Sequence, residues 1–255
     1  MLLAIDIGNT NLTLGLYEQE KLSKSWRLST DLQRMPDEYG LQILSLLQIC
    51  ECEPKQLKGL VLCSVVPTIS ERIIQACRQY LGTDPFIINH KLETGVKILY
   101  ENPDGVGADR IADAAAVYHL YGGPACVIDF GTATTFNALT ARGEYLGGAI
   151  APGIGIASEA LFNRTAKLAP VALNKPPNPI GRNTVHAIQS GLLFGYIGLV
   201  EGMVKRFRQE LGEKTRVIAT GGLANVIAPE TKAIDIIAPW LTLDGLRIIW
   251  ELNQK

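Results

Sequence analysis

Two short segments of the chain place an aspartate, a single spacer and a glycine at the end of an apolar run. They are LLAIDIGNTNLTLGLY (2–17) and ACVIDFGTATTFNALT (125–140), and Asp6 and Asp129 hold equivalent positions in them. A glycine lets such a turn approach a ligand, and successive backbone N–H groups there can bind an anion. The aspartate can hold a hydrated cation that bridges phosphate oxygens. Two turns of this kind, face to face, would hold a polyphosphate.

Polar side chains in and after both turns could add hydrogen bonds to phosphate oxygens. The candidates are Asn9, Thr10, Thr132, Thr134 and Thr135. Either segment alone is also compatible with an ordinary β-hairpin, because such turns favour Asp and Gly anyway. The repeated spacing favours the phosphate-binding interpretation. The sequence lacks the Walker pattern and a G-x-G-x-x-G after a strand, so it excludes P-loop and Rossmann sites.

The stretch YENPDGVGADR (100–110) is the third candidate for chemistry. Gly105 and Gly107 free the backbone, and Asp109 with Arg110 opens an apolar helix. A carboxylate beside an arginine in a glycine-lined pocket is suited to act as a general base with an anion-binding partner. An aspartate at a helix start is also often only a cap, and this alternative stays open.

Strands and helices must position these three motifs. Apolar runs bounded by turn residues predict strands at 2–7, 12–17, 20–28, 59–65, 125–129, 133–140, 143–150 and 217–222. Boundary residues and apolar spacing predict helices that begin at Pro36, Pro67, Gly107, Gly153 and Thr184, with a last helix over 241–251. TGG (220–222) ends the last strand, where it either passes close to an adenosine or caps a helix. This order predicts an α/β fold with two domains around a cleft, at residues 1–115 and 116–255.

Composition and charge narrow the class of protein. The chain has 255 residues, 47% of them hydrophobic and 19% charged, with a net charge of −1. We therefore expect no binding to nucleic acid and none to an anionic membrane. The sequence shows neither a signal peptide nor an apolar run of the roughly 20 residues that a membrane helix needs. Its five scattered cysteines suit reduced thiols, which predicts a cytoplasmic protein.

The whole set of motifs resembles the type III pantothenate kinases. The matching stretches are DIGNTN (6–11), CSVVP (63–67), YENPDGVGADR (100–110), DFGTATTF (129–136), GGAIAPG (147–153), GRNTVHAIQSG (181–191) and TGG (220–222). They follow the family's order and span nearly the whole chain. The family belongs to the actin, Hsp70 and sugar-kinase superfamily. The resemblance therefore implies two actin-like (ribonuclease H-like) domains around a nucleotide cleft.

The resemblance also implies an activity. The enzyme would transfer the γ-phosphoryl group of ATP to the primary hydroxyl of pantothenate, giving 4′-phosphopantothenate in the first step of coenzyme A biosynthesis. It would need Mg²⁺ and a monovalent cation, potassium or ammonium. It would act as a homodimer, with the long helix after Thr184 as a candidate interface element.

Residue roles follow from the same resemblance. ATP would be held by Asp6, Ile7, Gly8, Asn9, Thr10, Asn11, Leu12, Thr13 and Thr132. Pantothenate would be held by Tyr100, Gly107, Ala108, Asp109, Arg110 and Thr184. Asp109 would accept the proton of the hydroxyl, and Asp129 would bind the monovalent cation. Asn137 departs from the family, which more often has Asp there, and this weakens any metal role for it.

Three alternatives remain from the sequence. A kinase of another small hydroxyl substrate, such as a sugar, would show the same two turns but would leave YENPDGVGADR unexplained. A catalytically inactive regulatory homologue would be expected to have lost one of Asp6, Asp109 and Asp129, which are all present. An actin- or chaperone-like ATPase fits poorly, because the chain is too short for the extra subdomains. His186, close to Thr184, could also approach a substrate.

Overall fold

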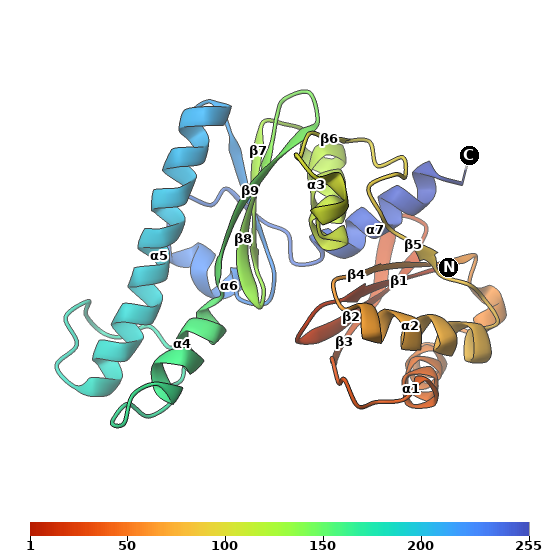
Figure 1. Ribbon diagram of the computed structural model, residues 1–255, viewed down its shortest axis with the longest axis horizontal. Helices are drawn as coiled ribbons and strands as arrows, with labels where there is room; N and C mark the ends of the chain where they lie inside the picture. Colours follow the sequence, from red (N-terminus) through yellow and green to blue (C-terminus); the bar gives the residue numbers. More distant parts are fainter. Residues whose placement is uncertain (255) are drawn as a thin grey trace. The chain divides into compact units, whose positions relative to one another are not determined.

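The computed structural model describes residues 1–254, and the chain forms two compact units (Figure 1). Unit 1 contains residues 1–121 together with the chain from Leu241 onward, and unit 2 contains Gly122–Trp240. We predicted a domain boundary between residues 115 and 116. The two units instead divide after Tyr121, where helix α3 (Ala108–Tyr121) ends. The closing helix, which the sequence analysis assigned to the second domain, belongs to unit 1.

Unit 1 is built on a five-stranded mixed sheet in the order β3-β2-β1-β4-β5. The strands are β1 (Leu2–Ile7), β2 (Asn11–Glu18), β3 (Lys21–Ser29), β4 (Gly59–Ser64) and β5 (Phe86–Ile87). Strands β1, β2 and β3 form an antiparallel meander, whereas β1, β4 and β5 run parallel. The carboxyl ends of these parallel strands therefore lie at one edge of the sheet, the edge that binds ligands in open α/β sheets.

Helices cover both faces of this sheet. They are α1 (Pro36–Ile49), α2 (Pro67–Ala76), α3 (Ala108–Tyr121) and α7 (Leu241–Leu252). Unit 1 also contains the short turns η1 (Pro54–Gln56), η2 (Cys77–Leu81) and η3 (Pro103–Gly105) and the two-residue strand β6 (Lys97–Ile98). Leu3, Ile5 and Ile7 of β1 share one hydrophobic cluster with α1 and α2. Because side chains alternate along a strand, Asp6 points to the other face, the face that α3 and α7 cover (Figure 1).

Helix α7 belongs to unit 1 because its apolar face packs against other elements of that unit. Leu241, Leu246 and Ile249 are fully buried, and α7 packs on β1, β4 and α3. Burying each such side chain contributes about 1.5–3 kcal/mol. The contact joins residues more than a hundred positions apart, so sequence patterning gives no sign of it.

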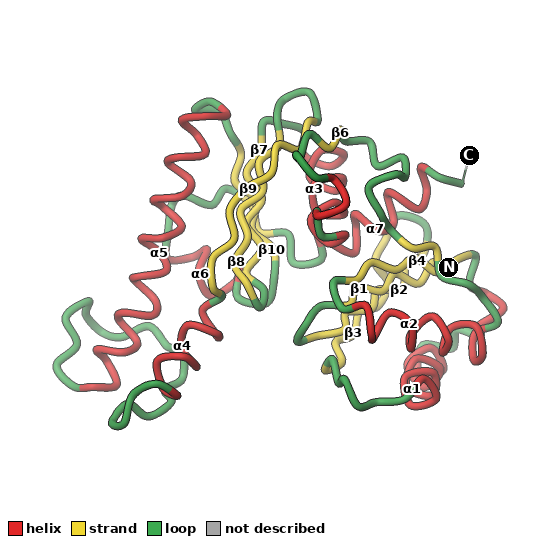
Figure 2. Tube along the Cα trace, viewed as in Figure 1, coloured by secondary structure: helices red, strands yellow, loops and turns green. Residues whose placement is uncertain are grey.

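Unit 2 repeats the plan on a second sheet. Its strands are β7 (Ala125–Phe130), β8 (Ala133–Leu139), β9 (Glu144–Pro152), β10 (Arg216–Thr220) and β11 (Ile236–Ile237), in the order β11-β10-β7-β8-β9. Helices α4 (Ile154–Asn163), α5 (Thr184–Leu211) and α6 (Ala224–Ile227), with η4 (Ala228–Glu230), lie on one face of it (Figure 2). The two units thus share a β-meander followed by a parallel strand, as the internal repeat predicts.

Helix α5 begins and ends with clear signals. The side chain of Asn183 accepts a hydrogen bond from the backbone N–H of His186 at 2.8 Å, and Gly212 follows the last turn with a φ of 101°. By length and composition this one helix could cross a membrane. Its residues Leu193, Val200 and Val204 are instead buried in the core of unit 2. The helix therefore serves as the core helix of a folded unit.

Candidate active site

The first Asp–x–Gly turn joins β1 to β2. The backbone N–H of Gly8 donates to the carbonyl of Asn11 at 3.0 Å, and the carbonyl of Gly8 accepts from the hydroxyl of Thr30 at 2.7 Å. Asn9, Thr10 and Asn11 are exposed and carry polar side chains at the surface of the turn. Ile7 and Leu12, two of the predicted ATP-binding residues, are fully buried. Their side chains pack in the core beneath the turn. Only their main-chain groups could therefore contact a ligand.

Asp6 lies at the end of β1 beside Cys63 of the parallel strand β4. The two residues are register partners, and the Cys63 thiol donates to Oδ1 of Asp6 across 3.2 Å. Burial raises the pKa of Asp6 to about 7; the thiol hydrogen bond lowers it, and the nearby charge of Asp109 raises it. Asp6 is therefore a carboxyl group in a water-poor site, close enough to Asp109 for their charges to interact.

Asp109 lies in the first turn of α3, and its side chain packs closely against Gly107. Its Oδ1 accepts the backbone N–H of Arg110 at 2.7 Å. A Cβ on Gly107 would collide with this same oxygen. Burial raises the pKa of Asp109, while the backbone N–H and the charge of Arg110 lower it. The carboxylate thus supports the start of the helix and lies within electrostatic range of Arg110, which is only 8% exposed.

A cavity of about 480 Å³ opens at the carboxyl ends of β4 and β5. One wall is the stretch from Asp104 to Ala108, which contains two of the predicted substrate-binding residues, and the other wall is the loop at Ile88–Lys91. His90 Nδ1 lies 3.5 Å from Oδ1 of Asp104 across it. Sequence reasoning missed this loop, because only the parallel pairing of β5 with β4 places it here. Tyr100 is 37% exposed and does not line this cavity.

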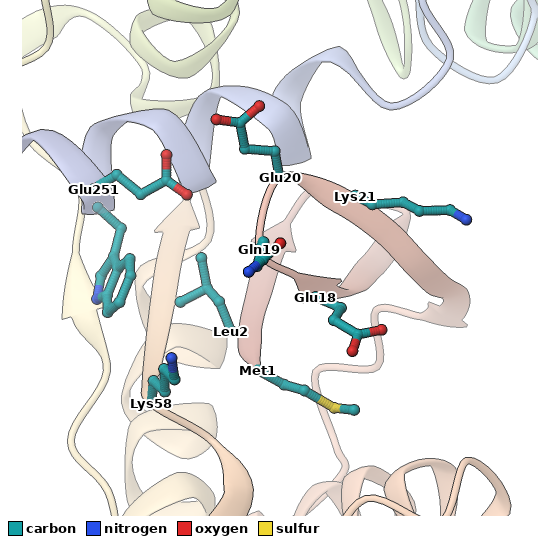
Figure 3. A pocket seen from close by; sticks show the side chains of 9 residues that line it. Met1, Leu2, Glu18, Gln19, Glu20, Lys21, Lys58 and Glu251 are labelled. Carbon is teal, nitrogen blue, oxygen red and sulfur yellow. The ribbon is translucent and has the colours of Figure 1, made fainter.

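A larger pocket of about 870 Å³ lies at the opposite edge of the same sheet (Figure 3). Met1 and Leu2 at the start of β1, Lys58 before β4 and the β2–β3 turn line it. Figure 3 shows Glu18, Lys21 and Glu251 around it, so charges of both signs are mixed there. It contains none of the predicted site residues and lies away from the carboxyl ends of the parallel strands.

The second Asp–x–Gly turn joins β7 to β8 in unit 2. Asp129 is the register partner of Thr220 on the parallel strand β10. Gly221, the next residue, has a φ of 88°, and a Cβ there would collide with Oδ1 of Asp129. A Cβ on Gly131 would lie 3.3 Å from the other carboxylate oxygen. Two glycines therefore let the main chain approach both oxygens of this carboxylate closely.

The threonines after the second turn have separate roles. Thr132 is exposed, and its carbonyl accepts the backbone N–H of Gly153 at 3.2 Å. Thr134 is 1% exposed, so its hydroxyl is closed to a ligand. Thr135 accepts from the amide of Asn137 at 3.1 Å, and Asn137 in turn accepts from Tyr145 at 3.1 Å. Asn137 is thus a buried structural residue, which explains why an amide suits this position.

Thr184 begins α5 and lines a groove of about 810 Å³ between α4 and α5. Leu161, Leu168 and Leu192 supply most of its apolar surface. His186 lies one turn into the helix, where its backbone N–H and Nδ1 face the Asn183 side chain. The imidazole is therefore part of the helix cap.

The predicted site residues thus fall into two groups. Asp6 and Asp109 approach each other within unit 1, whereas Asp129, Thr132 and Thr184 belong to unit 2. Within the described residues, 1–254, no group of three or more His, Cys, Asp or Glu side chains could hold a metal ion. A cation at Asp6 or Asp129 would therefore need ligand oxygens from main-chain carbonyls, water or a bound phosphate.

Comparison of the fold with solved structures defines the class. The chain superimposes on a ROK family glucokinase from Streptomyces griseus, crystallised with glucose and AMPPNP, with a TM-score of 0.53 at 12% identity over 99% of each chain. A Campylobacter jejuni protein described as a Baf family transcriptional activator gives 0.63 at 20% identity over 99% of this chain and 98% of that one. With its two Asp–x–Gly turns, the chain has the fold of the actin-like sugar kinases.

Sequence comparison then identifies the family. A family model for type III pantothenate kinase matches residues 2–206. A type III pantothenate kinase from Moorella thermoacetica is 52% identical over 253 residues, covering 99% of this chain and 100% of that protein. The chain belongs to the type III pantothenate kinase family. It is a kinase of the transferase class, which uses ATP, and an inactive regulatory homologue is not favoured.

Proposed function

We propose that this protein transfers the γ-phosphoryl group of ATP to the primary hydroxyl of pantothenate, and that Asp6 and Asp109 carry the chemistry. The observation that supports this most is that these two half-buried carboxyl groups interact electrostatically at the ligand-binding edge of the unit 1 sheet. Membership of the family supplies the acceptor. The proposed product is 4′-phosphopantothenate, the first intermediate of coenzyme A biosynthesis, made in the cytoplasm.

The β1–β2 turn, residues 6–13, is the proposed site for the phosphates of ATP. The polar side chains of the exposed residues Asn9, Thr10 and Asn11 are suited to bind their oxygens. The family resemblance assigns Thr132 to the nucleotide as well. A magnesium ion bound with the nucleotide would neutralise charge on the phosphates. Asp6 would hold that ion, because a cation relieves the cost of ionising a buried carboxyl group beside a second one.

Asp109 is the proposed proton acceptor. A base with a raised pKa takes the hydroxyl proton more readily as the phosphoryl group is transferred. The backbone N–H and the charge of Arg110 lower that pKa again, which favours the ionised form that accepts a proton. Gly107, Ala108, Arg110 and Tyr100 would hold the acceptor beside it.

Asp129 is the proposed site of a monovalent cation. The glycines at 131 and 221 let main-chain groups come close to its two oxygens. A loose shell of one carboxylate, carbonyls and a phosphate suits potassium or ammonium better than the strict octahedron of Mg²⁺.

We also propose that the protein acts as a homodimer. Thr184 lines an apolar groove, and Gly191, Gly195 and Gly198 of the same helix have open space where a Cβ would be. A second copy packed on this helix would cover the groove and supply Thr184 to the partner's acceptor site. Light scattering at micromolar concentration should give twice the mass of one chain. A fully active monomer would refute this part of the proposal.

The acceptor is tested with a panel. ADP release is measured with ATP, Mg²⁺ and potassium, adding in turn pantothenate, glucose and N-acetylglucosamine. The proposal expects release with pantothenate alone. A folded sample that phosphorylates only a sugar would instead support a sugar kinase, and a sample inactive with every acceptor would support a regulatory protein.

A further inference from the structure

Asp113 lies one helical turn after Asp109 on α3, and the sequence analysis gave it no role. Side chains four residues apart share one face of a helix, so Asp113 shares the face that carries Asp109. It is 1% exposed, and a buried carboxyl group is costly unless hydrogen bonds compensate it. The hydroxyl of Thr242 on α7 donates to Oδ1 of Asp113 at 2.8 Å.

The two helices also touch at the backbone. A Cβ on Gly245 would collide with the carbonyl oxygen of Ala112, the residue before Asp113. Gly245 lies three residues after Thr242, so the hydrogen bond and the close approach occupy one turn of α7. Together they leave α3 little freedom to slide along α7.

Helix α7 is in turn fixed to the sheet. The hydroxyl of Tyr17 on β2 donates to Oδ1 of Asp244 at 2.7 Å. The guanidinium of Arg247 lies 5.8 Å from the centre of the Tyr17 ring and contacts Glu251 at 2.7 Å. These contacts connect β2, which follows the proposed ATP turn, through α7 to α3, which carries the proposed base.

The face of α3 that carries both aspartates is turned toward Cys63 and Asp6. Burial raises the pKa of the Cys63 thiol well above its usual value, and the charges of Asp6, Asp109 and Asp113 raise it further. All three carboxyl groups therefore lie within electrostatic range of one buried thiol. A small displacement of α3 would change the distance between Asp109 and Asp6.

We infer that Thr242 and Asp113 are positioning residues for phosphoryl transfer, because their hydrogen bond fixes α3 on α7 and so holds Asp109 in place beside Asp6. The inference rests on the proposed role of Asp109 as the base. Neither residue needs to touch a substrate. A displacement of a catalytic group by about 1 Å can cost about 10²-fold in rate, so the loss of this bond should reduce turnover.

The test compares two hydrogen bonds that α7 makes. Thr242→Val removes the bond to α3 at nearly constant volume, and Tyr17→Phe removes the bond to β2 without touching α3. Thr242→Ser restores the hydroxyl. Steady-state kcat and KM for ATP and pantothenate are measured for each, with thermal unfolding as the check on folding. If Thr242→Val does not fold, Thr242→Ala removes the same hydroxyl.

We expect Thr242→Val to lower kcat by about tenfold or more, with KM for ATP within about twofold of wild type. Thr242→Ser should return kcat to within about threefold of wild type, and Tyr17→Phe should keep kcat although its unfolding midpoint falls. Equal kcat losses in Thr242→Val and Tyr17→Phe, or no loss in Thr242→Val, would overturn the inference. If Asp109→Asn retains full kcat, the base assignment fails and the positioning role fails with it. Loss in Asp109→Asn with no loss in Thr242→Val overturns the positioning role alone.

Discussion

The two Asp–x–Gly turns begin with the same sequence pattern but lie in different surroundings. In unit 1, Asp6 has a thiol as its neighbour on the parallel strand, and burial raises its pKa to about 7. In unit 2, Asp129 has Thr220 and then Gly221, whose missing side chain lets the backbone pack closely on the carboxylate. The parallel neighbour, which the repeat does not contain, therefore decides what each aspartate can do.

The helices that pack on each sheet add to this difference. Unit 1 places α3, with Asp109 and Asp113, near Asp6. Unit 2 places α4, α5 and α6 on its sheet, and their buried residues are mostly apolar. A duplicated turn has thus become an acidic centre in one unit and a carboxylate packed against glycine backbone in the other. The proposed division follows: proton transfer belongs to unit 1, and the monovalent cation to unit 2.

The largest expected effect is that of Asp109→Asn. Asparagine keeps the size and the acceptor for the Arg110 N–H but cannot take a proton. We expect kcat to fall by about 10²–10⁴, the usual contribution of a general base, with KM for ATP little changed. Glu101→Gln, an exposed change in the same motif, is the matched control. Since Asn caps a helix about as well as Asp, a kcat within about threefold of wild type would identify Asp109 as a cap only.

Asp6→Asn should stabilise the folded state at high pH and abolish activity. The folded-state pKa of about 7 lies above the ordinary value of 3.8, so ionising Asp6 opposes folding, and its favourable contribution is lost as pH rises from about 4 to 7. In metal-free buffer at pH 8 the variant should therefore be more stable, by at most about 4 kcal/mol. The gain should disappear near pH 4, and activity should be lost. Urea unfolding at both pH values measures this, with Glu18→Gln as control. A gain that is the same at both pH values would contradict the burial of an ionisable Asp6.

Asp129→Asn tests the other half of the comparison. Removing a ligand carboxylate should weaken potassium activation by at least the roughly 10–100-fold that loss of an outer-shell partner costs. The assay is a potassium titration of kcat at fixed ionic strength, with sodium as the replacement ion. Full activity of the wild type in sodium alone, or an unchanged potassium midpoint in the variant, would contradict a monovalent-cation site at Asp129.

Gly221→Ala has the smallest expected effect. The new Cβ collides with the Asp129 carboxylate at a φ that side chains rarely adopt, so unfolding should become easier by about 1–3 kcal/mol. Gly155→Ala, where a Cβ meets nothing within 4 Å, should be neutral or slightly stabilising. Thermal unfolding compares the two. Equal unfolding midpoints for the two variants would show that the chain tolerates a Cβ at position 221 beside Asp129.

Local patterns predicted most of the elements of this fold. The apolar run ended by Gly8-Asn9-Thr10 became β1 and its turn, and the Pro36 and Pro67 signals became the first residues of α1 and α2. The fold class is confirmed by comparison with actin-like kinases. The position of α7 was not predictable, because its partners are β1, β4 and α3.

The candidate site was predictable where its residues are close in sequence. Asp6, Asp109 and Asp129 stand in motifs that chemistry alone singles out, although their roles remain predictions. The Cys63 contact with Asp6 depends on a strand register across 57 residues, and the packing of Gly221 on Asp129 depends on another parallel pair. Asp113 could have been found from its spacing of four after Asp109. Its partner Thr242, more than a hundred residues away, could not.

The most direct test of the central claim follows ADP and the phosphorylated product together. Wild-type protein is incubated with ATP, Mg²⁺ and potassium, with and without pantothenate, and the product is identified by phosphorus NMR. The account predicts one phosphomonoester on the primary hydroxyl of pantothenate for each ADP, and no ADP above background when pantothenate is omitted. ADP formed at the same rate without pantothenate, or no phosphomonoester from a folded sample, would contradict it.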